Sequence, residues 1–292
     1  MINYSFIIPH KNCPDLLRRC VNSIPVRDDV QIIVVDDNSD EGKKPSLPER
    51  KGLEVVLLDA SQSKGAGRAR NVGLTKAEGK WLLFPDSDDY YVSSFMDVLD
   101  RYKESDADAV YFGAEYRDGK TGEKLKNLHF MDEIENYDGS TEGLETVRFH
   151  HNAPWTKMVS HAFVETINVN FEESLNGNDI LFSILIGFWG KKFLVERGVL
   201  YVYVKNSGSL VTEKKFDAEK KLCRIIQTIQ HNQFLSYIHH PEWKVNIIKQ
   251  ILYEIKQTGY KSTFAMIQTL FKNQQRIKRA KNEWVLMLEQ RK

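Results

Sequence analysis

The sequence of 292 residues lacks three features that would assign it to a class of protein at once. It contains no apolar run of about eighteen residues, so we expect no membrane-spanning helix. Its N-terminus has no basic start followed by an apolar stretch, so we expect no secretory leader. It has neither internal repeats nor low-complexity tracts, which argues against repeat proteins and disordered chains.

Cysteine is also scarce, with three residues at positions 13, 20 and 223. Cys13 and Cys20 both lie on a predicted helix, where their Cα atoms would be about 10 Å apart, too far for a disulfide. A chain without a disulfide framework fits a reducing compartment. We therefore expect a cytoplasmic protein, with the inner face of the cell membrane as a second candidate location.

The net charge of +1 conceals an uneven distribution along the chain. Residues 211–292 contain 16 basic and 7 acidic side chains, a net charge of +9. Residues 1–210 contain 25 basic and 33 acidic side chains, a net charge of −8. We expect the acidic part to hold the chemistry and the basic part to face an anionic partner.

Short apolar segments alternate with helical patterns through the first part of the chain. The predicted strands cover residues 4–9, 30–35, 53–58, 81–84, 108–114 and 192–204. The predicted helices begin at Pro14, cover 66–77 and 177–190, and continue from about residue 213; residues 115–150 are expected to form loops and hairpins. Because most of these strands are apolar throughout, we predict an α/β fold with a mostly parallel sheet covered by helices on both faces.

Polar clusters follow three of these strands, at Pro9, at Asp36-Asp37 and at Asp86 to Asp89. Ligands of parallel sheets bind beyond the carboxyl ends of the strands. Asp86, Asp88 and Asp89 would repel one another unless a cation lay between them. A hard divalent metal that bridges to a substrate diphosphate fits this Asp-x-Asp pattern, although an ordinary acidic turn fits it too.

Two further segments could bind a nucleotide. Asp36-Asp37-Asn38-Ser39 could accept a hydrogen bond from a base, or form a plain Asx-turn. Residues 64–71 form a glycine-containing turn that opens a helix, a place where backbone N–H groups favour phosphate, and Arg68 and Arg70 could add charge. A dinucleotide fingerprint is disfavoured because these glycines follow the third strand rather than the first.

Four motifs stand in an order and spacing that resemble the family-two inverting glycosyltransferases of the GT-A fold. The motifs are Ile7-Ile8-Pro9, residues 33–39, residues 69–74 and residues 84–89. The resemblance implies a GT-A Rossmann-like catalytic domain over 1–210, with a nucleotide-binding half (1–114) and an acceptor-binding half (115–210). Residues 211–292 would form a basic helical extension.

The resemblance also implies roles for the matching residues on the donor side. Pro9 would line the base pocket, and Asp37 with Asp36 would hold the base. Arg70 would steady the acidic cluster or the diphosphate. Asp86 would lie near the ribose, and Asp88 would be the direct ligand of Mn²⁺ or Mg²⁺.

On the acceptor side the resemblance makes Asp179 the catalytic base, in a segment where Asn178 replaces the family's glutamate. An aspartate at a helix start is also a common cap, which is the alternative. Trp155 and Lys205 are candidate contacts to the acceptor or the diphosphate, with simple packing as the alternative for Trp155. The histidine that the family often has near Lys205 is absent, so metal ligands beyond the Asp-x-Asp pair are open.

The implied activity is metal-dependent, inverting hexosyl transfer from a nucleotide diphosphate sugar, with a UDP-sugar favoured. The acceptor would be a hydroxyl of a glycan or lipid-linked molecule in bacterial surface polysaccharide or lipopolysaccharide synthesis. One alternative is a sugar-phosphate nucleotidyltransferase, although residues 10–14 poorly match its glycine-rich phosphate loop. The other is a silent nucleotide-sugar-binding module, against which Asp88 and Asp179 both argue.

The basic helical extension suggests a peripheral contact with an anionic membrane. Its cationic cluster comprises Lys272, Arg276, Lys278, Arg279 and Lys281, and its apolar residues include Ile277, Trp284, Val285, Leu286 and Leu288. Such a helix could lie in the membrane interface, or it could be a solvated face packed on protein. No nucleic-acid reader motif accompanies the basic residues, so we expect no nucleic-acid partner.

Overall fold

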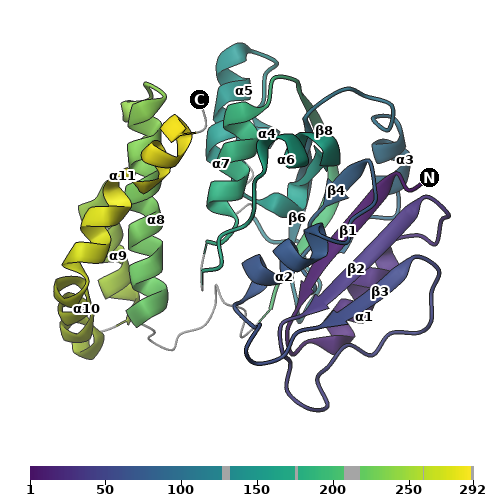
Figure 1. Ribbon diagram of the computed structural model, residues 1–292, viewed down its shortest axis with the longest axis horizontal. Helices are drawn as coiled ribbons and strands as arrows, with labels where there is room; N and C mark the ends of the chain where they lie inside the picture. Colours follow the sequence, from purple (N-terminus) through teal and green to yellow (C-terminus); the bar gives the residue numbers. More distant parts are fainter. Residues whose placement is uncertain (127–131, 175–176, 207–217, 259, 291–292) are drawn as a thin grey trace. The chain divides into compact units, whose positions relative to one another are not determined.

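The computed structural model describes residues 1–126, 132–174, 177–206, 218–258 and 260–290 (Figure 1). The chain forms two compact units, one of Met1–Glu173 with Asn178–Ser209 and one of Ser174–Gly177 with Leu210–Lys292. Within the residues described, no helix combines the length and the apolar character that crossing a bilayer requires. Cys13 and Cys20 are free thiols, as predicted.

The described part of the first unit contains an eight-stranded sheet with the order β3-β2-β1-β4-β7-β6-β8-β5. The strands are β1 (Tyr4–His10), β2 (Val30–Asp36), β3 (Leu53–Leu57), β4 (Trp81–Leu83), β5 (Tyr90–Tyr91), β6 (Ala109–Asp118), β7 (Lys157–Ser160) and β8 (Phe193–Lys205). Strands β1 to β4 pair in parallel, as do β6 and β8. The predicted α/β class is confirmed, and the sheet is mixed because β7 lies antiparallel between β4 and β6.

Helices cover both faces of this sheet, as β1 shows. Successive side chains of a strand point to opposite faces. Ile7 lies against α2 (Ala66–Leu74), so closely that a Cβ added at Gly73 would be 2.3 Å from its Cγ2. On the opposite face, the ring of Phe6 packs against Tyr91 and against Phe95 of α3 (Phe95–Asp100).

The remaining helices of this unit are α1 (Pro14–Ser23), α4 (Asp132–Glu135), α5 (Thr141–His150), α6 (His161–Ile167) and α7 (Ile180–Trp189), with a 3₁₀ turn at η1 (Pro154–Thr156). The prediction of loops and hairpins over 115–150 is wrong where α4 and α5 lie. Helix α5 buries little, chiefly Val147 and Phe149, so it has a weak helical pattern. Its start is nevertheless capped, because the Ser140 Oγ accepts from the Gly143 N–H at 2.9 Å.

The second unit is helical in its described part, as predicted for the C-terminal extension. It contains α8 (Ala218–Tyr237), α9 (Ile247–Thr258), α10 (Tyr260–Lys272) and α11 (Gln274–Gln290), with a 3₁₀ turn at η2 (Pro241–Trp243). Leu222 and Ile226 of α8 are buried, and Leu270 and Ile277 pack against them. Apolar residues of several helices thus form the interior of this unit.

Candidate active site

The acidic segment Asp86–Asp89 follows β4 and is anchored to β8 by buried hydrogen bonds. The backbone N–H of Asp86 donates to the Tyr201 Oη at 3.0 Å, and this hydroxyl donates to the Asp89 Oδ2 at 2.8 Å. The Val204 N–H donates to the Asp89 Oδ1 at 2.7 Å. Asp89 is completely buried, so its carboxylate serves to hold the segment in place.

The negative charge of Asp88 is weakly compensated by neighbouring side chains. Burial, reinforced by the negative charge of Asp86, raises the pKa of Asp88 to about 6. Its Oδ2 accepts from the Asn206 Nδ2 at 3.4 Å, whereas Arg19 donates to its backbone carbonyl. Among the residues that the structure describes, no lysine or arginine side chain forms an ion pair with this carboxylate. A cation bound at Asp88 would supply the missing charge.

The residues present fit a divalent metal that is shared with a substrate. The described chain has no group of three or more His, Cys, Asp or Glu residues placed to hold a metal ion. Asp88 could therefore provide one oxygen ligand, with the remainder coming from a diphosphate and water. Mg²⁺ binds in this way, through one or two carboxylates plus substrate phosphates.

Arg70 joins the acidic segment to the residues that precede α7. Its Nη2 donates to the Asp86 Oδ1 at 2.5 Å and its Nη1 donates to the Asn178 Oδ1 at 2.7 Å. Helix α2, which carries Arg70, lies so close to this segment that a Cβ added at Gly67 would be 2.0 Å from the Glu172 carbonyl oxygen. The Arg70 side chain is buried. Because its guanidinium is planar and rigid, the two hydrogen bonds fix the positions of Asp86 and Asn178.

Asp179 precedes α7 as its N-cap residue, but its side chain makes no capping hydrogen bond. Its backbone carbonyl accepts from the Ser183 N–H at 3.0 Å, as the first turn of the helix requires. Burial raises the pKa of the half-buried Asp179 carboxyl, and the positive charges of Arg70 and Lys157 oppose the rise. No capping hydrogen bond therefore occupies the Asp179 carboxyl, in contrast to the cap alternative.

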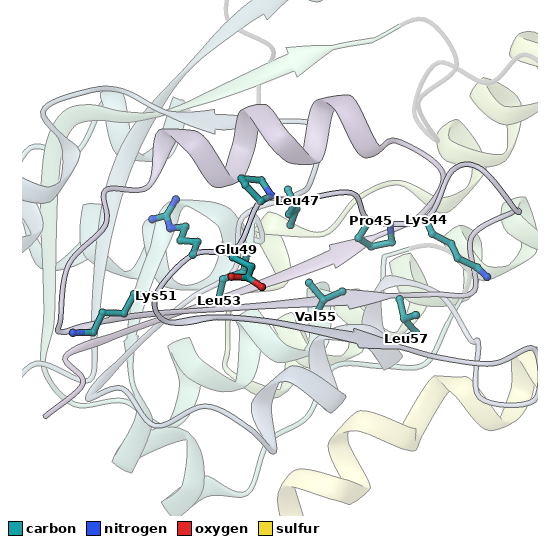
Figure 2. A pocket seen from close by; sticks show the side chains of 10 residues that line it. Lys44, Pro45, Leu47, Glu49, Lys51, Leu53, Val55 and Leu57 are labelled. Carbon is teal, nitrogen blue, oxygen red and sulfur yellow. The ribbon is translucent and has the colours of Figure 1, made fainter.

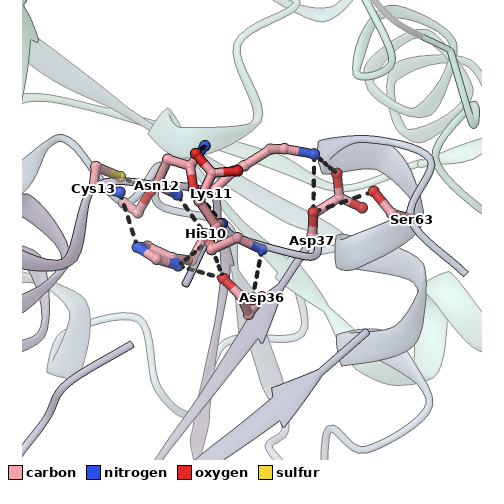
Figure 3. Close-up of polar contacts among 10 residues, drawn as sticks. His10, Lys11, Asn12, Cys13, Asp36, Asp37 and Ser63 are labelled. Carbon is pink, nitrogen blue, oxygen red and sulfur yellow. Dashed lines mark hydrogen bonds and ion pairs between the residues drawn. The ribbon is translucent and has the colours of Figure 1, made fainter. Parts of the chain in front are cut away.

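Asp36 is engaged inside the protein (Figure 3). Its Oδ1 accepts from the His10 Nδ1 at 2.7 Å and from the Ser39 Oγ at 2.5 Å. The His10 Nε2 accepts from the Cys13 N–H at 3.2 Å, so the proton of this imidazole is on Nδ1. This Ser-His-Asp cluster therefore has no free basic nitrogen for nucleophilic catalysis; it holds the turn after β2 against the start of α1.

Asp37 also accepts hydrogen bonds from the protein, and it reaches the glycine-containing turn before α2. The Lys64 N–H donates to its Oδ1 and the Gly65 N–H to its Oδ2, each at 3.1 Å. The Lys11 Nζ donates to the same Oδ2 at 3.2 Å (Figure 3). Pro9 is buried in β1 and pairs with Val35, just before these residues. Two of the predicted nucleotide-binding segments thus meet at one sheet edge.

The two acceptor-side candidates lie in different surroundings. The Trp155 ring stacks on Tyr201 with centroids 5.0 Å apart and is 8% exposed, so its contacts are those of the packing alternative. Lys205 is exposed at the end of β8. Residues 207–209, which follow soon after it, lie outside the described residues. Asn206, next to Lys205, was not predicted as a site residue, because its contact with Asp88 joins segments that are far apart in the sequence.

The pocket in Figure 2 is separate from this cluster. It is lined by residues 44, 45 and 47–51 and by three side chains of β3, Leu53, Val55 and Leu57. None of the residues predicted to bind nucleotide, metal or acceptor contributes to its wall.

The sequence matches the family model described as "Glycosyl transferase family 2" over residues 5–167, more than half of the chain. It is 33% identical over 92 residues to the UDP-Glc:alpha-D-GlcNAc-diphosphoundecaprenol beta-1,3-glucosyltransferase WfaP of Escherichia coli. That match covers 31% of this chain and 37% of WfaP. The uncharacterized glycosyltransferase YibD of Escherichia coli K12 is 24% identical, over 86% of this chain and 76% of its own.

Staphylococcus aureus TarS, a poly(ribitol-phosphate) beta-N-acetylglucosaminyltransferase, is 27% identical over 62% of this chain, which spans 30% of TarS. The crystal structure of TarS 1–349 in complex with UDP-GlcNAc superposes with a TM-score of 0.63 at 19% identity. That likeness covers 96% of this chain and 81% of the TarS chain, and it supports the GT-A fold. On the match to its family model, the chain belongs to glycosyl transferase family 2.

Proposed function

We propose that this protein transfers a hexose from a nucleotide diphosphate sugar, a UDP-sugar in our interpretation, to a hydroxyl of a glycan or lipid-linked acceptor. The process would be bacterial surface polysaccharide synthesis at the cytoplasmic face of the membrane. The observation that carries the proposal is the contact of Arg70 with both Asp86 and Asn178, which brings the Asp-x-Asp segment next to Asp179. Family membership and the TarS complex with UDP-GlcNAc support it.

On the donor side, we assign nucleotide binding to residues 1–114. Pro9 and Asp37 would face the base, and Asp36 would shape the pocket through the turn that it holds. Asp86 would contact the ribose while Arg70 keeps it in place. Asp88 would hold Mn²⁺ or Mg²⁺, which when bound neutralises charge on the leaving diphosphate.

On the acceptor side, we assign residues 115–210 and make Asp179 the general base. The Asp179 carboxylate takes the proton of the acceptor hydroxyl while the hydroxyl oxygen attacks the anomeric carbon. The bond from that carbon to the diphosphate oxygen breaks as the new glycosidic bond forms, so the configuration inverts. A pKa above the ordinary range makes Asp179 a stronger base for this step.

A calorimetric titration tests the donor site. UDP, GDP, CDP and dTDP would each be added with and without Mn²⁺. We expect tight binding of UDP that depends on the metal; binding of a different nucleotide would change the donor, and no binding of any would remove the proposal. Turnover of a sugar phosphate with a nucleoside triphosphate would instead indicate a nucleotidyltransferase, whereas binding without any transfer would indicate a silent module.

For the helical extension, the structure corrects which residues could touch a membrane. Trp284 and Leu288, predicted to dip into the interface, are buried, and the Lys281 side chain lies outside those described. Leu286 of α11 is exposed, as that prediction requires. Further exposed apolar residues lie on α9, at Ile248 and Leu252, and on α10, at Phe264, Ile267 and Phe271.

We infer that the exposed apolar residues of α9 and α10 are the part of the extension that touches anionic lipid. Residues at spacings of three, four and seven share one side of a helix. Lys249 and Lys272, on the same helices, are exposed, and each basic residue contributes about 1 kcal/mol near an anionic surface.

Flotation with phosphatidylserine-containing and with purely zwitterionic vesicles tests this contact. We expect recovery with the anionic vesicles, lost in a Phe264→Ser/Phe271→Ser variant and kept in Val26→Ser, an exposed apolar residue of the other unit. Equal recovery of all three proteins would refute the contact.

A further inference from the structure

Lys157 is a lysine whose whole side chain is buried, at the first position of β7. Lysine is almost never fully buried unless its charge is compensated. Its Nζ donates to the carbonyl oxygens of His151 and Ala153, at 2.9 and 2.6 Å, and to the Ser183 Oγ at 3.2 Å. No acidic side chain among the described residues is in ion-pair contact with it.

The contacts of Lys157 are those of an ammonium group. The Ser183 hydroxyl donates its own hydrogen to the Asn152 carbonyl at 2.7 Å, so it accepts from Lys157. Three acceptors match the three N–H bonds of an ammonium, whereas a neutral amine would direct its lone pair at one of them. Burial lowers the pKa of Lys157 to about 7, and the carboxylates of Asp179 and Glu133 oppose this shift.

These contacts tie two segments of the acceptor side together. His151 to Ala153 connect α5 to η1, which carries Trp155. Ser183 lies one turn into α7, and its N–H donates to the Asp179 carbonyl. Lys157 therefore links the segment before Trp155 to the first turn of the helix that begins after Asp179.

We propose that Lys157 is a positioning residue for glycosyl transfer, which fixes the first turn of α7 and keeps a positive charge behind the carboxylate of Asp179. The inference rests on the proposed role of Asp179 as base. This role belongs to a lysine that contacts none of the residues assigned to donor binding or to metal binding.

Asp179 and Lys157 each have further charged groups nearby. Asp179 faces Arg70 of α2 and Asp86 after β4, in addition to Lys157. Lys157 faces Glu133 of α4 and lies over the Tyr111 ring of β6, at 5.5 Å from its centroid. Arg70 supplies the larger favourable effect on ionised Asp179, and Lys157 adds to it from β7.

The test compares Lys157→Met, which keeps the chain length and removes the charge, with Lys157→Arg, which keeps the charge. Steady-state kinetics from pH 5 to 9, UDP affinity and melting temperature would be measured for each. In Lys157→Met we expect kcat to fall by about ten- to hundredfold with unchanged UDP affinity. The acid limb of its kcat profile should move to higher pH, because Asp179 has lost a cation that favours its ionised form. Lys157→Arg should return the limb to its original pH.

The outcomes separate this role from a merely structural one. A Lys157→Met protein with a lower melting temperature but the original kcat profile would overturn the inference. If Lys157→Met does not fold, Ser183→Ala takes its place: we expect a lower kcat with an unmoved acid limb, and an unchanged kcat would overturn the inference. Asp179→Asn is assayed in parallel. Full turnover by that variant would refute the proposed base, whereas an inactive Asp179→Asn beside an unaffected Lys157→Met would refute only the role of Lys157.

Discussion

Asp86 and Asn178, far apart in the sequence, accept hydrogen bonds from the same guanidinium, that of Arg70, at 2.5 and 2.7 Å. One side chain therefore sets the separation between the proposed donor site and the proposed catalytic base. A flat, forked donor can hold two partners at fixed directions, whereas an ammonium is a point charge.

Replacing Arg70 by lysine should therefore lower turnover more than donor binding. The shorter ammonium side chain of Arg70→Lys could reach Asp86 or Asn178, but not both in their present positions, and we expect kcat to fall about a hundredfold. Kinetics with saturating donor would measure it. The control is Arg68→Lys, because half-buried Arg68 pairs with Glu173 at 3.2 Å and should tolerate the change. A wild-type kcat in Arg70→Lys would show that the two contacts do not set the geometry.

The role of Asp179 as base is tested by Asp179→Asn, which preserves shape and removes the proton acceptor. We expect turnover to fall by roughly two to four orders of magnitude while calorimetry shows unchanged UDP binding. Asp97→Asn, an exposed acid on α3, is the matched control. Retained turnover in Asp179→Asn would exclude the assignment.

The raised pKa of Asp179 predicts the pH dependence of activity and stability together. Only ionised Asp179 can take a proton, so kcat should fall with decreasing pH through a value above the ordinary aspartate pKa of about 3.9. For the same reason, ionised Asp179 costs folding free energy at neutral pH, and Asp179→Asn should melt at a higher temperature than the wild type at pH 7. This gain should vanish below about pH 3.9, where the unfolded chain is protonated too. An Asn variant that melts earlier at pH 7 would contradict the prediction.

Two neighbouring aspartates should behave differently when each is replaced by asparagine. Asp88→Asn should abolish the Mn²⁺-dependent part of UDP binding and leave metal-free binding nearly unchanged. Because burial raises the pKa of Asp88 to about 6, its ionised form costs folding free energy at pH 7, and this variant should melt no lower than the wild type. Asp89→Asn should instead lower the melting temperature, because its buried carboxylate accepts from the Tyr201 hydroxyl and the Val204 N–H. Calorimetry and thermal melts distinguish the two. Identical behaviour of the variants would leave no separate metal role for Asp88.

The sequence predicted what depends on local pattern. Continuous apolar runs placed β1, β2 and β4, and strand ends placed the acidic segment at the edge where Asp37 and Asp86 now lie. The weakly patterned α5 could not be seen in this way, since it buries few side chains. Its N-cap Ser140 was the one local signal that could have revealed it.

Pairings between distant segments were out of reach for the same reason. The sequence pattern of an aspartate at the end of β2 is the same whether its carboxylate faces a nucleotide or His10. Only the folded chain shows that Asp36 accepts a hydrogen bond from His10. The orientation of α11 was equally hidden, because Trp284 and Leu288 suit a membrane face and a helix interface alike. Lys157 could not be singled out from the sequence, because its three acceptors come together only in the folded chain.

Gly67 and Gly73 of α2 limit which residues homologous chains can carry at these two positions. The helix is wedged between β1 and the segment before α7, with no room for a methyl group at Gly73 on one side or at Gly67 on the other. Arg70 lies between these two positions, so any displacement of the helix moves its guanidinium. An alanine at either glycine would impair transfer even though neither position contacts a ligand. Homologous chains with an alanine there are expected either to have lost the activity or to join the two segments that Arg70 holds through another residue.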